Sequence, residues 1–457
     1  METLQIDAKI TKYGYRVNYT HKLFEKFKND LIFIEDENDF NKNKPKKTIH
    51  CYRISKKQDG TRYIYIPLAY GIKNFGLCEY NYPHENIQLE FNGTLRDYQK
   101  DIVDKIINYF NNNDNTGGIL HASTGFGKSC CALYIISLLN VKSIIFVNKI
   151  TLLEQWVQSI KRFIPNARIG IIQGNKLEID NVDIIVAMYQ TFSRKFTHDY
   201  YFKGGIDFTS IGNLIIDEVH NISTKTFSNI LNVVQCKYRL GLSATPNRKD
   251  GFEKIYQYHL GDVICKYETT LLSPTIHIYN VDIDIPIEYL RWNKKINYTK
   301  LITDISENSQ RNNILIQITK QYITQHSDRK FILFCDRVHH CKTIASMLHR
   351  KGIDAKILAG KMKSKDKEIA MSSDIIVATY NMAGEGVDLP QLDTLIFCSP
   401  KKTIEQICGR ILRKKNKHPP LIIDICDTPQ ILKNTFWGRL NYYKQNKYQY
   451  VFKELGT

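Results

Sequence analysis

Two series of short apolar runs, each rich in Ile, Val and Phe, constrain the fold of this chain more than any other feature. Each run ends at a small or polar residue, and longer mixed segments separate consecutive runs. Continuous apolar strands with helical segments between them are typical of a parallel sheet covered by helices on both faces. The two series therefore predict two α/β lobes of similar design. The first series is 143–148, 183–188, 214–218 and 239–245, and the second is 330–336, 374–379, 394–399 and 421–426.

Residues 1–90 follow a different pattern. Two alternating runs flank Gln-Asp-Gly within 51–67, which predicts a β-hairpin and a small α+β domain. We expect an accessory domain at 1–90, a first lobe at 91–270 and a second lobe at 271–457. The aromatic-rich segment 436–456 has helical spacing, so we expect a closing helix packed on the second lobe.

The chain carries 64 basic and 46 acidic residues among 457, a formal net charge of +18. This excess favours a polyanionic partner, although lysines spread over a solvated surface explain it equally well. No segment has the apolar core of a signal peptide or the length of a membrane span, so no membrane partner is expected. The eleven cysteines are scattered without a C-x-x-C pair, which favours reduced thiols in an intracellular protein.

Residues 121–130, HASTGFGKSC, lie between an apolar run and a segment with helical character. This strand-loop-helix context is what a phosphate-binding loop requires, because backbone N–H groups and a helix N-terminus then face the anion. Gly125 and Gly127 let the main chain approach closely. Lys128 is expected to contact the β- and γ-phosphates of ATP, and Ser129 to hold Mg²⁺.

A second apolar run ends in two carboxylates, Asp217 and Glu218. Asp217 suits the outer shell of Mg²⁺, and Glu218 can orient and deprotonate an attacking water. An Asp-Glu pair after a strand is often a helix cap. Together with the phosphate loop, the pair indicates a site for ATP hydrolysis.

The motifs of the chain resemble those of superfamily 2 helicases of the DEAD/H type, in the expected order over about 95–415. The loop fits the form A-x-x-G-x-G-K-[ST] of that superfamily, so Ala122 at the first position is normal there. The other motifs are LRDYQK at 95–100, DEVH at 217–220, SAT at 243–245, EGVDLP at 385–390 and QICGRILR at 406–413.

The resemblance implies two tandem RecA-like parallel-sheet domains, with ATP and Mg²⁺ as cofactors. It implies that Gln99 contacts adenine, that Gly386 and Asp388 lie near a ribose or backbone, and that Arg410 and Arg413 supply charge to the transition state. The resemblance also implies that four residues couple the ATP state to nucleic-acid binding, namely His220, Ser243, Thr245 and Gln406. The expected catalytic residues are Lys128, Glu218, Arg410 and Arg413. The expected ATP-binding residues are Gln99, Ser123, Thr124, Gly125, Phe126, Gly127, Lys128, Ser129, Asp217, Gly386 and Asp388, with Ser129 and Asp217 at the metal.

Resemblance also supplies the candidate nucleic-acid contacts, each of which follows an apolar run and carries a donor suited to phosphate oxygens. Any one of them is equally acceptable as an ordinary cap or loop residue. They are Asn148, Lys149, Gln190, Thr191, Arg337 and Thr379.

The run YRLGLSATPNRKDG at 238–251 is similar to the XPB and UvsW branch of DNA translocases, and residues 65–76 are similar to the poxvirus transcript-release helicase and its large-DNA-virus relatives. We therefore expect an ATP-dependent helicase or translocase acting on DNA in repair, recombination or transcript release. An RNA helicase and a non-catalytic assembly factor are the alternatives. The expected polymer partner is DNA, and the expected protein partners are RNA polymerase or repair and replication proteins. The expected location is intracellular, with a virion or a viral replication compartment as further options.

Overall fold

The computed structural model of the 457-residue chain describes residues 7–11, 14–34, 48–78, 84–123, 125–196, 208–221, 230–231, 233–244, 252–267, 272–289, 296–360, 362–384, 391–405, 407–408, 416–428 and 430–455. It divides into two compact units, Met1–Thr269 and Thr270–Thr457.

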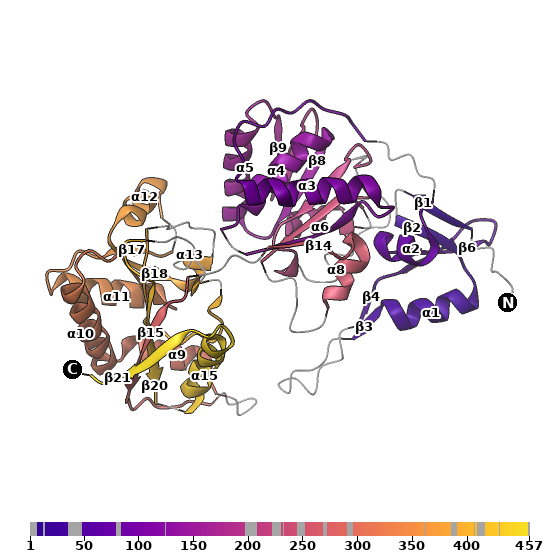
Figure 1. The fold of residues 1–457 in the computed structure, drawn as a ribbon. Coiled ribbons are helices and arrows are strands. Elements are labelled where there is room, and N and C mark those ends of the chain that lie inside the picture. Colours follow the sequence, from indigo (N-terminus) through magenta and orange to yellow (C-terminus); the bar gives the residue numbers. More distant parts are fainter. Residues whose placement is uncertain are drawn as a thin grey trace. The chain divides into compact units, whose positions relative to one another are not determined.

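The N-terminal part of the first unit is an α+β module (Figure 1). Its main sheet has the antiparallel order β1-β2-β6-β5, and β3 pairs with β4 in a separate ribbon. The antiparallel pairing of β5 with β6 across the Gln-Asp-Gly turn confirms the predicted hairpin. The elements are β1 (Ala8–Thr11), β2 (Gly14–Asn18), α1 (His21–Leu31), β3 (Ile32–Ile34), β4 (Thr48–His50), β5 (Arg53–Lys56), β6 (Arg62–Ile66) and α2 (Leu68–Phe75).

The remainder of the first unit is built on a sheet of order β10-β9-β11-β8-β12-β13-β7-β14. All neighbouring strands run parallel except β9 and β10, which form an antiparallel pair. Its elements are α3 (Asp97–Asn112), β7 (Gly117–Ala122), α4 (Lys128–Leu139), β8 (Ser143–Val147), α5 (Ile150–Phe163), β9 (Ile169–Gln173), β10 (Lys176–Leu177), β11 (Ile184–Met188), α6 (Tyr189–Phe196), β12 (Asn213–Ile216), the 3-10 turn η1 (Val219–Asn221), β13 (Tyr238–Ser243), α8 (Glu253–Leu260) and β14 (Val263–Tyr267).

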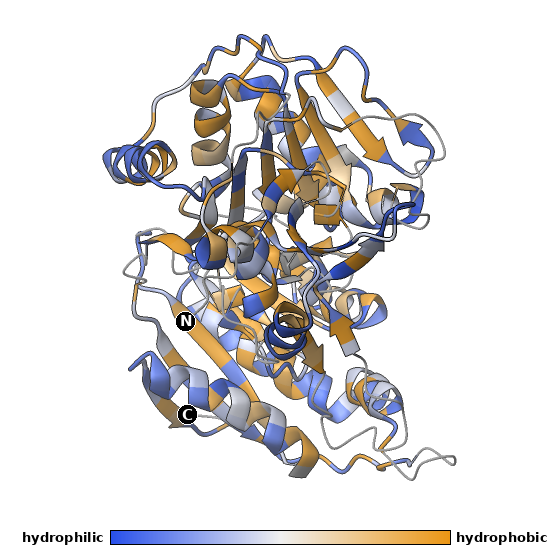
Figure 2. Ribbon diagram, turned by 90° about the vertical axis from the view of Figure 1, so that its right-hand side faces the viewer, coloured by the Kyte–Doolittle hydropathy of each residue, from blue (hydrophilic) through white to orange (hydrophobic). Residues whose placement is uncertain are grey.

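Alternate residues of each strand enter two separate hydrophobic cores, one on each face of this sheet. Ile145 and Val147 of β8 pack with helices α3, α4 and α5, whereas Ile144 and Phe146 pack with α6 and α8. Burial on both faces explains why the strand is apolar at every position rather than at every second one. Figure 2 shows the strands mainly in the colour of apolar residues.

The second unit contains a sheet of order β17-β18-β16-β19-β20-β15-β21 in which all neighbouring strands are parallel. All eight apolar runs of the sequence are therefore strands of two parallel sheets, as predicted. The elements are β15 (Thr275–Val281), α9 (Tyr298–Glu307), α10 (Ser309–Gln325), β16 (Phe331–Cys335), α11 (Val338–His349), β17 (Lys356–Leu358), α12 (Ser364–Ser372), β18 (Ile375–Thr379), α13 (Tyr380–Gly384), β19 (Thr394–Phe397), β20 (Leu421–Asp427), α15 (Gln430–Gln445) and β21 (Gln449–Lys453).

The prediction of one closing helix over 436–456 is wrong in its last part. Helix α15 ends at Gln445, and Lys447 takes a positive φ of 55°, which stops the helical path. The following Tyr-Val-Phe segment forms β21, which pairs in parallel with β15. Aromatic and β-branched residues fit a strand as well as a helix, and the available sheet edge decides between them.

The N-terminal module and α8 share one hydrophobic core. Phe252 and Ile255 at α8 are buried together with Tyr15, Val17 and Ile64 of the small sheet. Glycine is required at Gly71 of α2, because a Cβ there would lie 2.2 Å from the Tyr15 ring. No described helix combines the length and hydropathy needed to cross a lipid bilayer.

Candidate active site

The phosphate loop, the acidic pair and the Ser243 motif lie at the same edge of the first large sheet. The loop follows β7, Asp217 and Glu218 follow β12, and Ser243 ends β13. These three strands are neighbours in the order β12-β13-β7 and run parallel, so their carboxyl ends meet. Ligands of open parallel sheets bind at this edge.

The loop has the backbone expected of an anion-binding turn. Gly125 and Gly127 take φ values of 87° and 93°, which L side chains rarely adopt. Ala122 ends β7 with its side chain fully buried, and it is not among the positive-φ residues. The first loop position therefore needs no glycine, and α4 begins directly after Gly127, with no side-chain hydrogen bond from the N-cap residue. The N-terminus of a helix favours an anion.

Gln99 fastens the loop to the start of α3. Its amide Nε2 donates to the Phe126 carbonyl at 2.8 Å, and its Oε1 accepts from the Arg96 amide at 2.9 Å. The side chain is buried, and a Cβ on Gly127 would lie only 2.4 Å from its Nε2. These two bonds use one N–H and one lone pair of the Gln99 side-chain amide. Its second N–H and a second lone pair on Oε1 suit the adenine contact, which stays a prediction.

Two aromatic rings pack against Phe126 of the same loop. The Phe126 ring lies 5.4 Å from that of Tyr98 and 4.7 Å from that of Tyr267, centroid to centroid. Tyr98 precedes Gln99 on α3 and Tyr267 ends β14, so both edges of the loop are held by aromatic packing. Of these three rings only Phe126 was predicted at the site, because Tyr98 and Tyr267 come from other elements.

Lys128 is the first residue of α4 and is almost fully buried. Its Nζ donates to the Ala122 carbonyl at 2.8 Å, so the ammonium group reaches back to the first position of the loop. Ser129 is the next residue and occupies the first turn of the helix. Both positions agree with the predicted roles at phosphate and metal, which remain predictions.

The acidic pair contains two carboxylates in unlike surroundings. Asp217 accepts a hydrogen bond from the indole Nε1 of Trp156 at 2.9 Å, and both side chains are buried. Burial first, and Glu218 second, raise the pKa of the Asp217 carboxyl to about 6, while Trp156 and Lys128 oppose the rise. Binding of Mg²⁺ would favour the ionised form.

Glu218 takes a positive φ of 48°, an uncommon conformation for a residue with a Cβ. Its Oε2 is buried and makes no hydrogen bond to the part of the chain that the structure describes. It lies 3.5 Å from His220 Nδ1. A carboxylate with an open acceptor at the strand edge suits the predicted role of orienting a water.

His220 connects the acidic pair to the next strand. Its Nδ1 lies 2.8 Å from the Ser243 hydroxyl, and His121 at the end of β7 lies 3.0 Å from the Ala244 carbonyl. The Ser-Ala motif thus touches both the loop strand and the acidic strand. This arrangement agrees with the predicted coupling role of His220 and Ser243.

Four candidate nucleic-acid residues lie along the same edge of this sheet, just after strands β8 and β11. Gln190 donates to the Asn148 carbonyl at 3.0 Å, which joins the two segments. Lys149 occupies the N-cap position of α5 and is half-buried. Thr191 is buried and accepts from the Gly174 amide at 3.1 Å, so its hydroxyl has a structural bond of its own.

In the second unit, Arg337 follows β16, and Thr379 ends the neighbouring strand β18, where it pairs with Cys335 of β16. Arg337 occupies the N-cap position of α11 and its side chain lies 3.5 Å from the Asp336 carboxylate, whereas Thr379 is buried. The Asp336 amide donates to the Ser399 hydroxyl at 3.0 Å. Contacts at the end of β19 thus fix the segment that carries Arg337.

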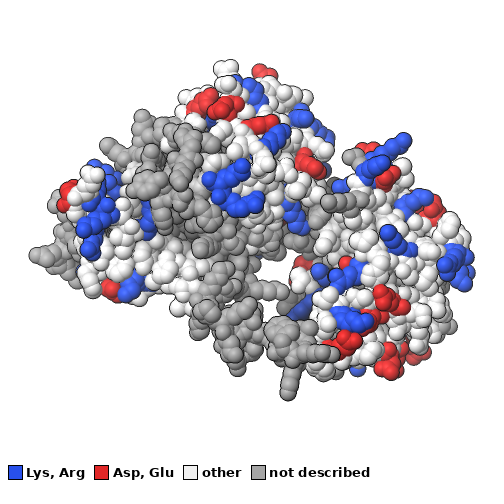
Figure 3. All heavy atoms as spheres, turned by 180° about the vertical axis from the view of Figure 1, so that it is seen from behind, with Lys and Arg blue, Asp and Glu red and all other residues white. Residues whose placement is uncertain are grey.

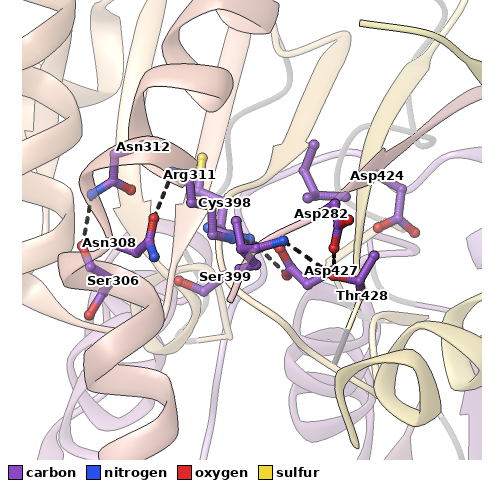
Figure 4. A network of polar contacts seen from close by, with 12 residues as sticks. Asp282, Ser306, Asn308, Arg311, Asn312, Cys398, Ser399, Asp424, Asp427 and Thr428 are labelled. Atoms are coloured by element: carbon purple, nitrogen blue, oxygen red, sulfur yellow. Dashed lines mark hydrogen bonds and ion pairs between the residues drawn. The ribbon is translucent and has the colours of Figure 1, made fainter. Parts of the chain in front are cut away.

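A buried polar network includes Ser399, which contacts that segment (Figure 4). Arg311, fully buried, donates to both carboxylate oxygens of Asp427 at 2.7 and 3.0 Å and to the Cys398 carbonyl at 2.6 Å. Full burial of such a pair requires this bidentate geometry. The network connects α10 to β20 and to the residue that follows β19. No local pattern in the sequence predicted it.

His340 continues the network as a neutral ring. Asn312 donates its amide N–H to the Ser306 carbonyl at 2.9 Å, so its Oδ1 accepts from His340 Nε2 at 3.0 Å. His340 Nδ1 then accepts from the Ser399 hydroxyl at 3.1 Å. Burial and the nearby Arg311 lower the pKa of His340 to about 3.

Several predicted site residues lie outside the described part of the chain, and their roles stay predictions. They are Thr124, Thr245, Gly386, Asp388, Gln406, Arg410 and Arg413.

Two family models match the chain. Residues 92–248 match the type III restriction enzyme res subunit, and residues 310–415 match the helicase conserved C-terminal domain. A putative ATP-dependent RNA helicase of Acanthamoeba polyphaga mimivirus is 29% identical over 464 residues, covering 97% of this chain and 86% of the relative.

Two solved structures share the fold. S. cerevisiae Dbp5 bound to RNA and ADP BeF3 is 13% identical, with a TM-score of 0.52 and coverage of 78% of this chain and 90% of that one. The type ISP restriction-modification enzyme LlaBIII bound to DNA is 17% identical, with a TM-score of 0.55 and coverage of 83% and 32%. They confirm the predicted fold class of two tandem RecA-like domains with a small N-terminal α+β domain.

Proposed function

We propose that this chain, which belongs to the superfamily 2 helicases and is related to those of large DNA viruses, hydrolyses ATP to move on or remodel DNA. One observation carries the ATPase part of the proposal. The loop with Lys128 and the pair Asp217–Glu218 follow strands separated by β13 alone in a parallel sheet. Neither motif can bind and hydrolyse a nucleoside triphosphate without the other.

The residues of this edge fit ATP with Mg²⁺. The amides of the loop and of the first turn of α4 would hold the phosphates together with Lys128, and Ser129 and Asp217 would hold the metal. Mg²⁺ supplies charge neutralisation at the phosphates when it is bound. The open acceptor of Glu218, which is buried, would orient the attacking water and take its proton.

The second unit would complete the ATPase. Arg410 and Arg413 match the last motif of the superfamily and would supply positive charge to the transition state. Their contribution would arise only in a closed state, which makes hydrolysis dependent on nucleic acid.

DNA is our proposed substrate, because residues 238–251 are similar to the XPB and UvsW branch, and because His220 and Gln406 replace the residues that DEAD-box RNA helicases carry at these positions. The second candidate is RNA, which the name of the mimivirus relative favours. The net charge of +18 suits either polymer. The proposed setting is the replication or transcription compartment of a virus, with a polymerase or repair protein as partner, because the relative is viral.

A stimulation assay separates these candidates. ATP turnover by the full chain would be measured with no polymer, duplex DNA, single-stranded DNA and RNA. We expect DNA to stimulate turnover, and Lys128→Ala and Glu218→Gln to abolish it, while Glu218→Gln retains ATP and DNA binding. Stimulation by RNA alone would replace DNA by RNA in the proposal. Absence of turnover with every polymer would leave the non-catalytic assembly factor.

A further inference from the structure

Helices α10 and α11 of the second unit pack beside each other and leave a groove between them. One half of it has a volume of about 570 Å³ and the other of about 520 Å³, and the halves are continuous because Asn313, Met347 and Arg350 line both. We call the groove bordered by residues 307–320 and 342–351 the α10–α11 groove. The part of α10 along it, 309–320, is about 17 Å long at 1.5 Å per residue.

The floor of the α10–α11 groove is apolar. Ile316 is buried and Met347 is half-buried, and both line the groove while they pack on the hydrophobic core of the second unit. Lys320 follows Ile316 by one turn of α10, and Arg350 follows Met347 by one turn of α11. Each helix thus places a cation one turn beyond an apolar residue of the floor.

The cations that line the groove are exposed, and they are Lys320, Lys342, Arg350 and Lys351. None of their side chains makes a hydrogen bond or an ion pair with the residues that the structure describes. Glu307 is the acidic residue of the lining, and its carboxylate lies 4.0 Å from His339 Nε2. The groove therefore carries an excess of positive charge that its own lining does not compensate.

Cations alone do not indicate a site, because Lys and Arg side chains are spread over the second unit in Figure 3, at the right of that view. The groove differs in combining uncompensated cations with an apolar floor. A phosphate polymer would pair with the cations and leave Ile316 and Met347 without a partner. A purely apolar ligand would cover the floor and remove water from the cations without replacing it. Both features are used by a ligand that has an apolar stripe between carboxylates.

We propose that the α10–α11 groove binds an acidic amphipathic helix of a partner protein. Residues at i, i+3, i+4 and i+7 of a helix form one stripe, and a groove between two helices accepts such a stripe. A length of about 17 Å corresponds to about three turns, enough for an apolar stripe over Ile316 and Met347. A helix satisfies its own backbone hydrogen bonds, which suits a groove that offers side chains rather than a free strand edge.

A second copy of this chain suits the groove less well than an acidic partner. The chain carries a net charge of +18, so a second copy would bring like charge towards the four cations. Binding of a partner helix in the groove requires neither ATP nor nucleic acid, because the groove lies wholly within the second unit. It can therefore be measured apart from the proposed ATPase.

Fluorescence anisotropy of a labelled synthetic peptide, measured with the full chain and without nucleotide, tests this proposal. The peptide is a helix of about three to four turns with leucine along one stripe and glutamate on both flanks of it. Two comparison peptides carry lysine in place of glutamate, or the same composition with the leucines scattered around the helix. The acidic striped peptide should bind about tenfold more tightly than either, and added salt should weaken its binding.

Three variants of the groove give different results. Lys320→Gln/Arg350→Gln should weaken binding of the acidic striped peptide about fivefold at low salt and reduce its salt dependence. Met347→Gln, which keeps the length of the side chain, should weaken binding about fivefold without changing the salt dependence. Glu307→Gln removes the like charge from the lining and should strengthen binding about twofold, which misfolding would not do.

The matched control is Lys365→Gln/Lys444→Gln, which removes two exposed charges from α12 and α15 of the same unit. Peptide affinity should not change in the control, and ATP turnover should stay normal in every variant. Equal affinity for the three peptides, unchanged affinity in the groove variants or an equal loss in the control would overturn the proposal.

Binding of labelled oligothymidine and of a DNA duplex is measured in the same variants. If Lys320→Gln/Arg350→Gln weakened binding of either polymer and left peptide binding intact, the groove would hold nucleic acid and the proposal would be wrong. Normal peptide binding by a chain that no polymer stimulates would instead contradict the proposed ATPase function alone.

Discussion

Trp156 of α5 donates its indole N–H to Asp217 at the end of β12, so a helix that contributes no predicted catalytic residue helps to set the ionisation of the acidic pair. The bond lowers the pKa of a carboxyl that burial and Glu218 raise to about 6. Asp217 must be ionised to serve a metal, which makes Trp156 a positioning residue for it.

The first prediction concerns Trp156→Phe, which keeps the buried ring and removes the donor. A hydrogen bond to a charged group contributes about 1.5–3 kcal/mol, so ATP turnover near pH 6 should fall about tenfold or more. Loss of the donor raises the pKa of Asp217, so the acid limb of the pH profile should move to higher pH. Trp437→Phe, at an exposed position of α15, is the control and should leave the profile in place.

The second prediction concerns Gly127→Ala. The positive φ of 93° and the 2.4 Å approach of Gln99 Nε2 both oppose a Cβ at this position. We expect the bond from Gln99 to the Phe126 carbonyl to break and the KM for ATP to rise about tenfold or more, equivalent to about 1.4 kcal/mol. Gly352→Ala has a similar φ of 77° with no atom within 4 Å, and it should cost stability without changing KM. An unchanged KM in Gly127→Ala would show that Gln99 does not fasten the loop.

The third prediction concerns Ser243→Ala, which removes the hydroxyl 2.8 Å from His220. If this contact couples the two activities, turnover without polymer should persist while stimulation by nucleic acid falls about tenfold, a coupling loss of about 1.4 kcal/mol. The comparison is Ser137→Ala on α4, whose hydroxyl donates to the Tyr134 carbonyl of its own helix. Equal losses of basal and stimulated turnover would assign Ser243 to catalysis instead.

The fourth prediction concerns acid stability. His340 has its pKa lowered to about 3, whereas an ordinary histidine titrates at 6.5. Between these values the unfolded chain binds a proton that the folded chain does not, so stability is lost as pH falls below 6.5. The contribution is about 1.4 kcal/mol per pH unit. His340→Gln should flatten the change in urea midpoint between pH 7 and pH 5.5, and His349→Gln, exposed on the same helix, should not. Identical slopes in both variants would refute the neutral buried ring.

The strands were predictable because burial on both faces leaves them apolar at every position, as at Ile144 and Ile145. The segment 449–453 was not, because its Tyr-Val-Phe pattern suits a helix or a strand, and only the free edge of β15 selects the strand. Local alternation could not reveal that edge.

The loop and the acidic pair were predictable for a related reason, since each is a short motif at the end of one strand. Trp156 was not, because it lies 61 residues from Asp217 and its contact depends on how α5 packs. The same holds for Arg311 and Asp427, which are 116 residues apart. Partners brought together by packing leave no spacing in the sequence.

The core shared by α8 and the N-terminal module bears on any attempt to assign that module by deletion. A chain shortened to begin near residue 91 would leave Phe252 and Ile255 without Tyr15, Val17 and Ile64 to cover them. Such a fragment would expose these apolar side chains to solvent. A loss of activity would then reflect misfolding or aggregation rather than a function of the module. Point substitutions at exposed positions of the module leave this shared core intact and therefore test the module more directly.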